Sequence, residues 1–426
     1  MYKRKLRILG LRAESGRWIF VVSGLIMMLC LGAIYAYSII RVHLEKIFEG
    51  YGIRASSTEM QLPYLTFLLL FALSMPLVGR YIEKYGPRKI ALLGAALVSL
   101  AWFSASIVGS PLMLVFLYGV IGGLGVGIAY NCPIVVSAKW FPDKRGLAVG
   151  LTVLGFGLSA ALIGPLADNL ATIFGAQVML RIFSLIFLAL MAVSAVSLHF
   201  PPGGWSPAGW NPSGQRKAAS VNLNRGEMTK TRSFYALWVC YMIGTLAGLM
   251  AIGISKQVGL EVAEKAGLGG EETSPILTAL IIPFALCNGL GRPLFGWLTD
   301  RLAPRKTAII SFALILIASL TIFLFQGSIS AYVFSFAILW LNLGGWLAIA
   351  PAATATLFGT KDYAQNYGLV FTAYGAGALV GNLMAGRIKD ILGSYMMVFP
   401  VVTMLSIVGI ITATILNPPE KPKREE

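Results

Sequence analysis

Arg292 lies about seven residues, or about 10 Å along a helix, inside an apolar stretch that runs from 275 to 298. An arginine at the centre of a bilayer costs about 2.5–3.5 kcal/mol on insertion scales, so some interaction must compensate for it. One candidate is a substrate carboxylate, which a planar guanidinium binds through two parallel hydrogen bonds. The other is packing, in which Arg292 bonds helix-end carbonyls or a protein carboxylate. The first interpretation predicts a binding site for a small organic anion.

Polar amides occur in the same apolar surroundings. Asn288 precedes Arg292 by one helical turn, while Asn131 and Asn342 lie in other apolar stretches. Such amides either bind a substrate or join two helices, and the second use is the commoner one. Small residues and a proline suit a locally open helix beside a ligand, and they are Gly289, Gly291 and Pro293.

Other reactive groups are sparse within the apolar stretches. All 18 acidic residues fall in loops, tails or the ends of these stretches, and Asp168 is the deepest. The four cysteines include no C-x-x-C pair, and His43 and His199 are far apart in the chain. No nucleophile lies beside a base. The sequence therefore predicts no metal site, no cofactor and no enzymatic activity, and it leaves Asp168 and His43 as candidates for a proton site.

The elements that must position these residues are membrane-spanning helices. Of the 426 residues, 57% are hydrophobic and only 12% are charged, whereas soluble proteins carry about 25% charged residues. This composition argues against a soluble enzyme and against a nucleic-acid-binding surface. Apolar runs of about 20 residues, which cross a roughly 30 Å hydrocarbon core, lie near 18–40, 61–79, 90–108, 112–137, 147–168, 178–200, 235–255, 275–298, 307–325, 330–352, 366–386 and 394–416. We therefore expect an all-α membrane protein with twelve spans and a retained first span.

The basic residues indicate the orientation of these spans. With the amino terminus in the cytoplasm, 25 of the 34 lysines and arginines fall in inner segments and seven in outer segments. The positive-inside rule then predicts that both termini are cytoplasmic. Arg181 sits at an outer helix end, where it can reach water. Only Arg292 remains within the membrane interior.

The chain also repeats itself. Gly79, Glu83, Pro87, Arg88 and Lys89 recur as Gly296, Asp300, Pro304, Arg305 and Lys306, all 217 residues later. Each copy follows the second span of its half, so we expect two homologous six-helix halves. The predicted parts are an amino-terminal bundle (1–200), a cytoplasmic linker rich in Pro, Gly, Ser and basic residues (201–233), a carboxy-terminal bundle (234–417) and a charged tail (418–426).

The repeated turn resembles the signature loop of the major facilitator superfamily. The segments at 125–130, 140–148, 288–293 and 366–368 further resemble the oxalate:formate antiporters and the related monocarboxylate transporters. The resemblance implies a carrier that works by alternating access. It also implies a conformational latch on the inner side, formed by Glu83, Arg88, Asp300 and Arg305.

By the same resemblance Arg292 binds the substrate carboxylate, and aromatic binding positions fall on Tyr374, Tyr130, Phe371 and Phe156. Tyr35 and Tyr37 of the first span are further candidates for the binding cavity, and Asn288 and Asn131 are candidate hydrogen-bond donors to the substrate. The sequence also departs from its relatives. Oxalate exchangers carry a lysine where this chain has Tyr374, so a single cation faces the substrate here. Animal-type carriers place the proton-accepting aspartate where this chain has Asn288, and their first-span lysine is matched by Ile39. The substrate predicted from these departures is a monocarboxylate such as lactate, pyruvate or formate, moved by exchange or with a proton.

Other functions remain open at this stage. An oxalate:formate-type dicarboxylate antiporter is the nearest alternative, and a drug or sugar transporter on the same fold is a more distant one. A membrane sensor or a lipid-modifying enzyme would be a non-transport role, but no appended soluble domain supports it. We expect a monomer in a plasma membrane, specifically a bacterial inner membrane, with small carboxylates, protons and the lipid bilayer as partners and without nucleic acid.

Overall fold

The computed structural model describes residues 7–8, 10–53, 55, 57–208, 222–268, 276–277 and 279–419. Two predicted segments therefore lie partly outside the described residues, namely the linker over 209–221 and the charged tail over 420–426. The described part of the chain is nearly all helical. Within it, eleven helices are long and apolar enough to cross a membrane.

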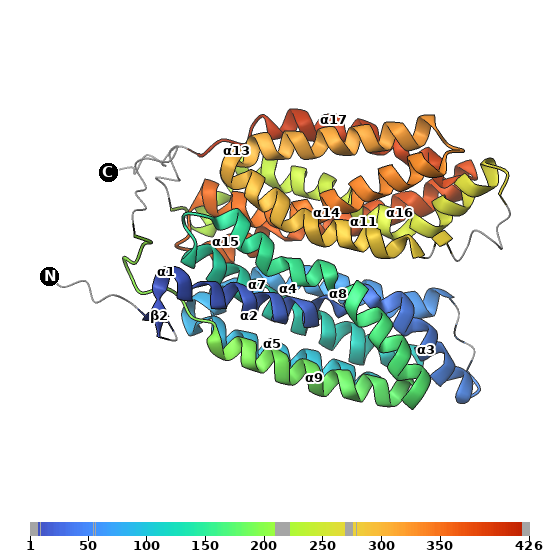
Figure 1. Cartoon of the computed structure of the whole chain (residues 1–426), viewed down its shortest axis with the longest axis horizontal. Coiled ribbons are helices and arrows are strands. Elements are labelled where there is room, and N and C mark those ends of the chain that lie inside the picture. Colours follow the sequence, from blue (N-terminus) through green and yellow to red (C-terminus); the bar gives the residue numbers. More distant parts are fainter. Residues whose placement is uncertain are drawn as a thin grey trace. The chain divides into compact units, whose positions relative to one another are not determined.

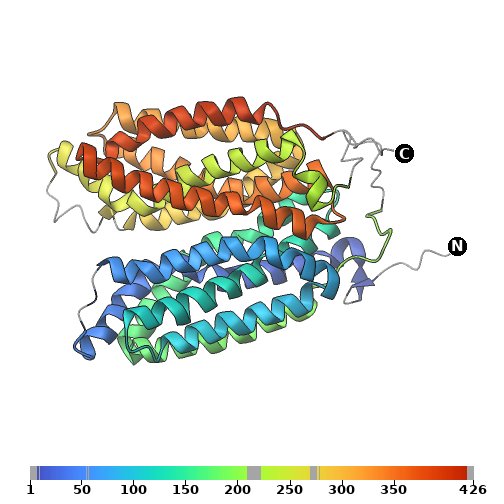
Figure 2. The same cartoon turned by 180° about the vertical axis from the view of Figure 1, so that it is seen from behind.

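The chain divides into two compact units. Unit 1 comprises residues 1–218 and 360–369, and unit 2 comprises residues 219–359 and 370–426. In each unit the helices run roughly parallel or antiparallel to one another (Figures 1 and 2). Unit 1 includes residues 360–369, which the sequence assigned to the carboxy-terminal bundle (234–417). The predicted bundle boundaries stay a prediction.

Unit 1 begins with a short hairpin that the all-α prediction did not include. Its elements are β1 (Arg7–Ile8), β2 (Leu11–Arg12), α1 (Ala13–Gly16), α2 (Trp18–Leu31), the 3₁₀ helix η1 (Gly32–Ala36), α3 (Tyr37–Gly50), α4 (Ser57–Tyr85), α5 (Pro87–Ala105), α6 (Pro111–Leu114), the π-helix η2 (Val115–Val120), α7 (Ile121–Trp140), α8 (Arg145–Phe174), α9 (Ala176–Ser197) and most of α15 (Tyr363–Val370). β1 and β2 pair antiparallel, with Ile8 opposite Leu11.

The first predicted span changes its winding where it crosses α8. Gly32 starts η1, and a Cβ at this position would meet the backbone of Phe156 and the side chain of Ser159. Ser159 reinforces the contact, because its Oγ donates a hydrogen bond to the Leu29 carbonyl at 2.7 Å. A carbonyl freed by tighter winding can accept such a bond. The consequence is that Tyr35, within η1, is held against α8.

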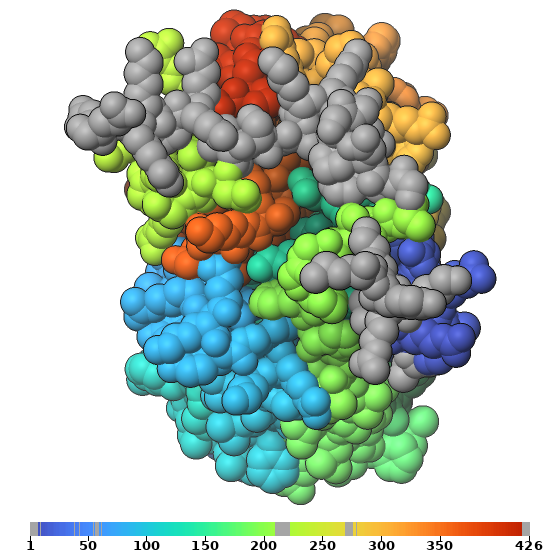
Figure 3. All heavy atoms as spheres, turned by 90° about the vertical axis from the view of Figure 1, so that its left-hand side faces the viewer, coloured from blue at the N-terminus to red at the C-terminus, as the bar shows by residue number. Residues whose placement is uncertain are grey.

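An ion pair closes the end of unit 1 at which α1 lies. The Arg17 guanidinium donates to both carboxylate oxygens of Asp143, at 2.6 and 2.7 Å, and to the carbonyl of Trp140 at 3.0 Å. It also covers the ring of Phe141 at 4.2 Å and that of Trp205 at 5.9 Å. Figure 3 faces this end, where the green residues that follow α9 lie next to the dark blue α1. The contacts fix the start of α2 to the turn between α7 and α8.

Unit 2 contains one helix that is too long for a single span. Its elements are α10 (Arg225–Met228), α11 (Arg232–Lys265), α13 (Ile281–Leu324), α14 (Ile329–Phe358), α16 (Thr372–Leu392), the 3₁₀ helix η3 (Tyr395–Met397) and α17 (Val398–Ala413). α13 has 44 residues, which at 1.5 Å each is about twice the thickness of a hydrocarbon core. It is interrupted at Ala303, where φ is 69° and ψ is 158°. Two predicted spans, 275–298 and 307–325, fall on either side of this break.

The break in α13 repeats a turn of unit 1. Gly86 separates α4 from α5 with φ 86° and ψ 156°, and Pro87 then begins α5. Ala303 stands 217 residues later in nearly the same conformation and is likewise followed by a proline, Pro304. Proline suits the first turn of a helix because that position needs no N–H donor. The repeated sequence motif therefore has the same backbone form in both halves.

Candidate functional site

Arg292 is fully buried on α13, with 0% of its surface exposed. Its Nη2 donates a hydrogen bond to Oδ1 of Asn288, one turn earlier on the same helix, at 3.1 Å. The amide nitrogen of Asn288 is buried, and within the described residues it has no hydrogen-bond partner. Buried polar groups are nearly always paired, so an unpaired donor marks a position where a ligand or water can bind. The two side chains thus form a polar centre that presents N–H donors.

The helix around Arg292 is not locally open, which corrects one expectation from the sequence. α13 continues without interruption from Ile281 to the break at Ala303. Gly291 lies against the carbonyl of Leu341, and Gly344 of α14 lies against the carbonyl of Asn288. A Cβ at either position would collide with backbone. The glycines therefore allow α13 and α14 to approach closely and hold the polar centre on a rigid pair of helices.

An aromatic group occupies the start of α16 in the same unit. The rings of Phe371 and Tyr374 stack with centroids 5.0 Å apart, and Phe371 contacts the ring of Tyr241 at 6.2 Å. Tyr241 in turn stacks on Trp346 at 6.3 Å. Phe371 stands between α15 and α16, the point at which the predicted eleventh span is divided. The structure thus joins two predicted site residues, Phe371 and Tyr374, with α11 and α14.

Unit 1 brings three other predicted residues together. The ring of Phe156 meets Tyr130 at 5.4 Å and Tyr35 at 4.9 Å, both in edge-on contacts. Phe71, which was not predicted, contacts Tyr130 at 5.0 Å and Phe156 at 5.9 Å. Edge-on and offset contacts are the favoured geometries of aromatic pairs. Tyr37, the other first-span tyrosine, lies in a separate group with Tyr64 and Tyr118.

Two predicted amides make helix-to-helix or backbone contacts. Asn131 is fully buried, and its Nδ2 donates to the carbonyl of Ala364 at 3.0 Å within unit 1. Asn342 accepts from Ser311 Oγ at 2.7 Å and donates to the Ile338 carbonyl at 2.9 Å. These bonds match the commoner use of an amide inside a membrane protein. A role for Asn131 in substrate binding stays a prediction.

The first copy of the repeated turn forms hydrogen bonds with the start of α15. The carboxylate of Glu83 accepts from the amide of Ala364 at 3.0 Å and from Gln365 Nε2 at 2.6 Å. An acidic group here satisfies a free N–H at a helix start and complements the helix dipole. Gly79 lies against the backbone of Ala364 and Gln365. The other predicted latch residues are exposed, namely Arg88, Asp300 and Arg305, and the latch itself stays a prediction.

Sequence reasoning missed two features of unit 1. Phe71 completes the aromatic group of unit 1, and the repeat contained a signal for it, because Phe71 stands 217 residues before Asn288. The pairing of Arg17 with Asp143 had no such signal, since the residues are 126 apart and belong to different predicted elements. Nothing in a single sequence relates two such positions.

A profile of the Major Facilitator Superfamily matches residues 19–354 and again 233–426. The oxalate:formate antiporter of Oxalobacter formigenes is 26% identical over 95% of this chain and 92% of its own length. The apicoplast pyruvate carrier 1 of Toxoplasma gondii is 24% identical over 76% of this chain and 68% of its own length. Monocarboxylate transporter 4 of Gallus gallus is 24% identical over 92% of this chain and 80% of its own length. These findings confirm the predicted family, whose members are carriers rather than enzymes. The chain is a multi-pass membrane transporter that belongs to the Major Facilitator Superfamily.

Proposed function

We propose that this transporter moves small monocarboxylate anions, of the lactate, pyruvate or formate type, by alternating access. The observation that carries the proposal is the fully buried Arg292 guanidinium beside the Asn288 amide. A carboxylate can take two hydrogen bonds from the guanidinium and one from the amide nitrogen. The names of the relatives support the same chemistry, because they include a pyruvate carrier and a monocarboxylate transporter.

The number of cations favours a monocarboxylate over oxalate. A dianion in a low-dielectric site needs two compensating charges, since a buried unpaired charge is costly. Arg292 supplies one such charge, and Tyr374 stands where the resemblance to oxalate exchangers would require a lysine. A phenol can instead donate a hydrogen bond to a hydroxyl or keto group. Oxalate:formate exchange is the alternative, and the antiporter of Oxalobacter formigenes is the relative that favours it.

The orientation is part of the proposal. Counting α13 as two spans gives twelve in total, in agreement with the hydropathy pattern. The excess of basic residues in alternate connecting segments favours cytoplasmic termini and a plasma membrane location. In this orientation Glu83 lies at the inner end of unit 1 and the carboxyl end of α3 at the outer end. We take the transporter to be a monomer and the chain to form two bundles joined by a cytoplasmic linker.

The charge of the site also has a kinetic consequence. When empty, the carrier must pass through a closed state with Arg292 lacking its anion, whereas the loaded site is locally neutral. Loaded transitions are therefore the easier ones, which favours exchange of one carboxylate for another. Net uptake with a proton then needs a proton-binding group other than Arg292.

Replacing Arg292 tests the function directly. Purified protein carrying Arg292→Gln or Arg292→Lys is reconstituted into liposomes preloaded with lactate, and uptake of labelled lactate, pyruvate and oxalate is measured. Glutamine removes the charge, and lysine keeps it but loses the two-pronged geometry. We expect at least about a hundredfold loss of exchange for Gln, equivalent to about 2.7 kcal/mol. Arg181→Gln is the matched control, because Arg181 is exposed and its Nε donates to the Ser106 hydroxyl at 3.1 Å.

Two results would contradict the proposal. Undiminished exchange by well-folded Arg292→Gln protein would remove Arg292 from the binding site. Saturable uptake of oxalate that exceeds uptake of every monocarboxylate would assign the alternative substrate class. A thermal-shift panel of mono- and dicarboxylates on the same proteins separates a binding defect from a defect in the transport cycle.

A further inference from the structure

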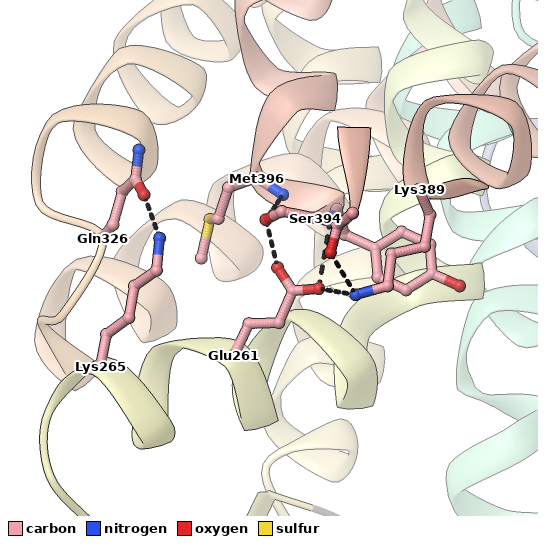
Figure 4. A network of polar contacts seen from close by, with 8 residues as sticks. Glu261, Lys265, Gln326, Lys389, Ser394 and Met396 are labelled. Carbon is pink, nitrogen blue, oxygen red and sulfur yellow. Dashed lines mark hydrogen bonds and ion pairs between the residues drawn. The ribbon is translucent and has the colours of Figure 1, made fainter. Parts of the chain in front are cut away.

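An acidic residue near the end of α11 joins two neighbouring elements of unit 2. The carboxylate of Glu261 accepts from Lys389 Nζ at 2.7 Å, from Ser394 Oγ at 2.6 Å and from the amide of Tyr395 at 3.1 Å (Figure 4). Lys389 stands in the last turn of α16, and Ser394 and Tyr395 start η3. The contacts therefore connect the first predicted span of this half with its fifth and with the start of its sixth.

Unit 1 has an acid–base pair in the corresponding place. Nε2 of His43 on α3 lies 2.8 Å from Oδ1 of Asp168 on α8. Glu261 follows His43 by 218 residues, within one residue of the spacing of the repeated turn. Both pairs thus join the first and fifth predicted spans of a half, with the acid and the base exchanged between the helices. Because the two pairs occupy equivalent positions, we infer that each is a regular part of the structure of its unit.

The two pairs differ in how they respond to pH. Lysine and glutamate both stay charged across the physiological range, so the pair in unit 2 is permanent. Histidine is the side chain that commonly gains or loses its charge between pH 5 and 8. The His43 side chain is only 7% exposed, whereas that of Asp168 is 62% exposed. The pair in unit 1 therefore combines a buried proton acceptor with a carboxylate that water can reach.

The surroundings of His43 are otherwise balanced in charge. On α3 itself Arg41 is paired with Glu45 at 2.7 Å, and Lys46 and Glu49 are the other charged residues. On the elements that pack against α3, Asp168 belongs to α8, Arg181 of α9 donates to Ser106, and Glu59 belongs to α4. The 3₁₀ helix η1 contributes Tyr35 and no charged side chain. Among these groups Asp168 is the one bonded to the histidine.

A cavity gives the pair contact with solvent. It has a volume of about 650 Å³ and lies between the ends of α3 and α8 and the start of α9. His43, Lys46, Thr172 and Gln177 contribute polar groups to its lining. The mouth of this cavity is open, so water can carry protons to the buried imidazole.

We propose that the His43–Asp168 pair is a proton-binding site that supplies the proton accompanying net carboxylate uptake. The inference rests on the proposed function for its role in transport, but proton binding itself does not. A protonated His43 forms an ion pair with Asp168, and a neutral His43 keeps only a hydrogen bond. Proton uptake from the outer side thus changes the strength of the interaction between α3 and α8, while the Glu261–Lys389 ion pair in unit 2 stays unchanged.

Proton binding can be measured without transport, because the chain has only two histidines. Protein labelled with ¹⁵N-histidine and carrying His199→Gln leaves the imidazole of His43 as its single NMR signal. We expect this signal to respond to proton binding at His43. The same measurement is made in the Asp168→Asn background, where the 2.8 Å contact between Nε2 and the carboxylate is lost and the response of the signal to pH should change. A pH response of the signal that is the same in the Asp168→Asn protein, or a signal with no pH response, would overturn the pair as a proton site.

The role in transport is tested by measuring net uptake of labelled lactate into liposomes that contain no carboxylate, at an outside pH of 5.5 and of 7.5. We expect the lower outside pH to stimulate net uptake by the native protein, because a proton accompanies the anion. His43→Gln should lose the stimulation and keep exchange in preloaded liposomes, and Lys389→Gln should keep both. Full stimulation of His43→Gln would overturn the role in coupling. Absence of carboxylate flux in the native protein would instead reject the proposed function and leave the NMR result standing.

Discussion

The repeated turn offers a test of how backbone strain and residue type interact in the two halves. Gly86 and Ala303 adopt φ of 86° and 69° with ψ near 157°, a region that is almost exclusive to glycine. Only the second copy places a side chain there. We expect Ala303→Gly to stabilise the protein and Gly86→Ala to destabilise it, although both positions have the same fold around them.

The magnitude follows from two opposing effects. A non-glycine residue in this region costs about 1–3 kcal/mol. Glycine gives the unfolded chain more freedom, which costs about 0.4–1 kcal/mol. The difference predicts that Ala303→Gly raises the free energy of unfolding by about 1 kcal/mol. A Cβ at Gly86 would have no atom within 4 Å, so Gly86→Ala should lower it by a similar amount through backbone strain alone.

The assay is reversible unfolding of the purified protein in mixed micelles, with the double variant Gly86→Ala/Ala303→Gly as an internal check. Because the positions belong to different units, their effects should add, and the double variant should resemble the native protein. A shift of both single variants in the same direction would refute the reasoning, as would destabilisation by Ala303→Gly. Either result would mean that contacts of the Ala303 methyl group outweigh the strain.

Two further predictions concern the binding site and the end of unit 1. Asn288→Asp places a carboxylate about 3.1 Å from the Arg292 guanidinium, where it competes with the substrate. The apparent Kd for lactate should therefore rise at least about tenfold. Unchanged affinity in a binding titration would argue against the assigned site. Arg17→Ala or Asp143→Asn breaks an ion pair whose side chains are 7% and 17% exposed. Each variant should lower the free energy of unfolding by about 2–4 kcal/mol. The double variant Arg17→Asp/Asp143→Arg, which exchanges the two charges, should recover part of this stability. If the two losses of stability simply add in the double variant, the two side chains act separately.

Much of the fold could be predicted because its signals are local. Stretches of about 20 apolar residues specify helices in a solvent that cannot satisfy backbone polar groups. The turn of Gly86 and Pro87 was visible because it occurs twice. Arg292 was visible because a buried cation is so unusual in an apolar helix. Each of these signals lies within one segment or in its repetition.

The rest depends on contacts between distant segments. Asn131 donates to Ala364, which is 233 residues away, and His43 meets Asp168 over 125 residues. No periodicity in the sequence relates such positions. The glycines around Arg292 were misinterpreted for the same reason, because Gly291 is needed for the approach of Leu341 rather than for an opening of the helix. Composition identifies a small residue, but only the packed neighbour reveals its use.

The two halves use equivalent positions for opposite chemistry. Asn288 and Arg292 stand 217 residues after Phe71 and Met75, and all four side chains are buried. Unit 1 therefore presents an aromatic and a thioether where unit 2 presents an amide and a guanidinium. The repeat accounts for the fold that the halves share, and these departures from it place a buried cation at only one of two equivalent positions.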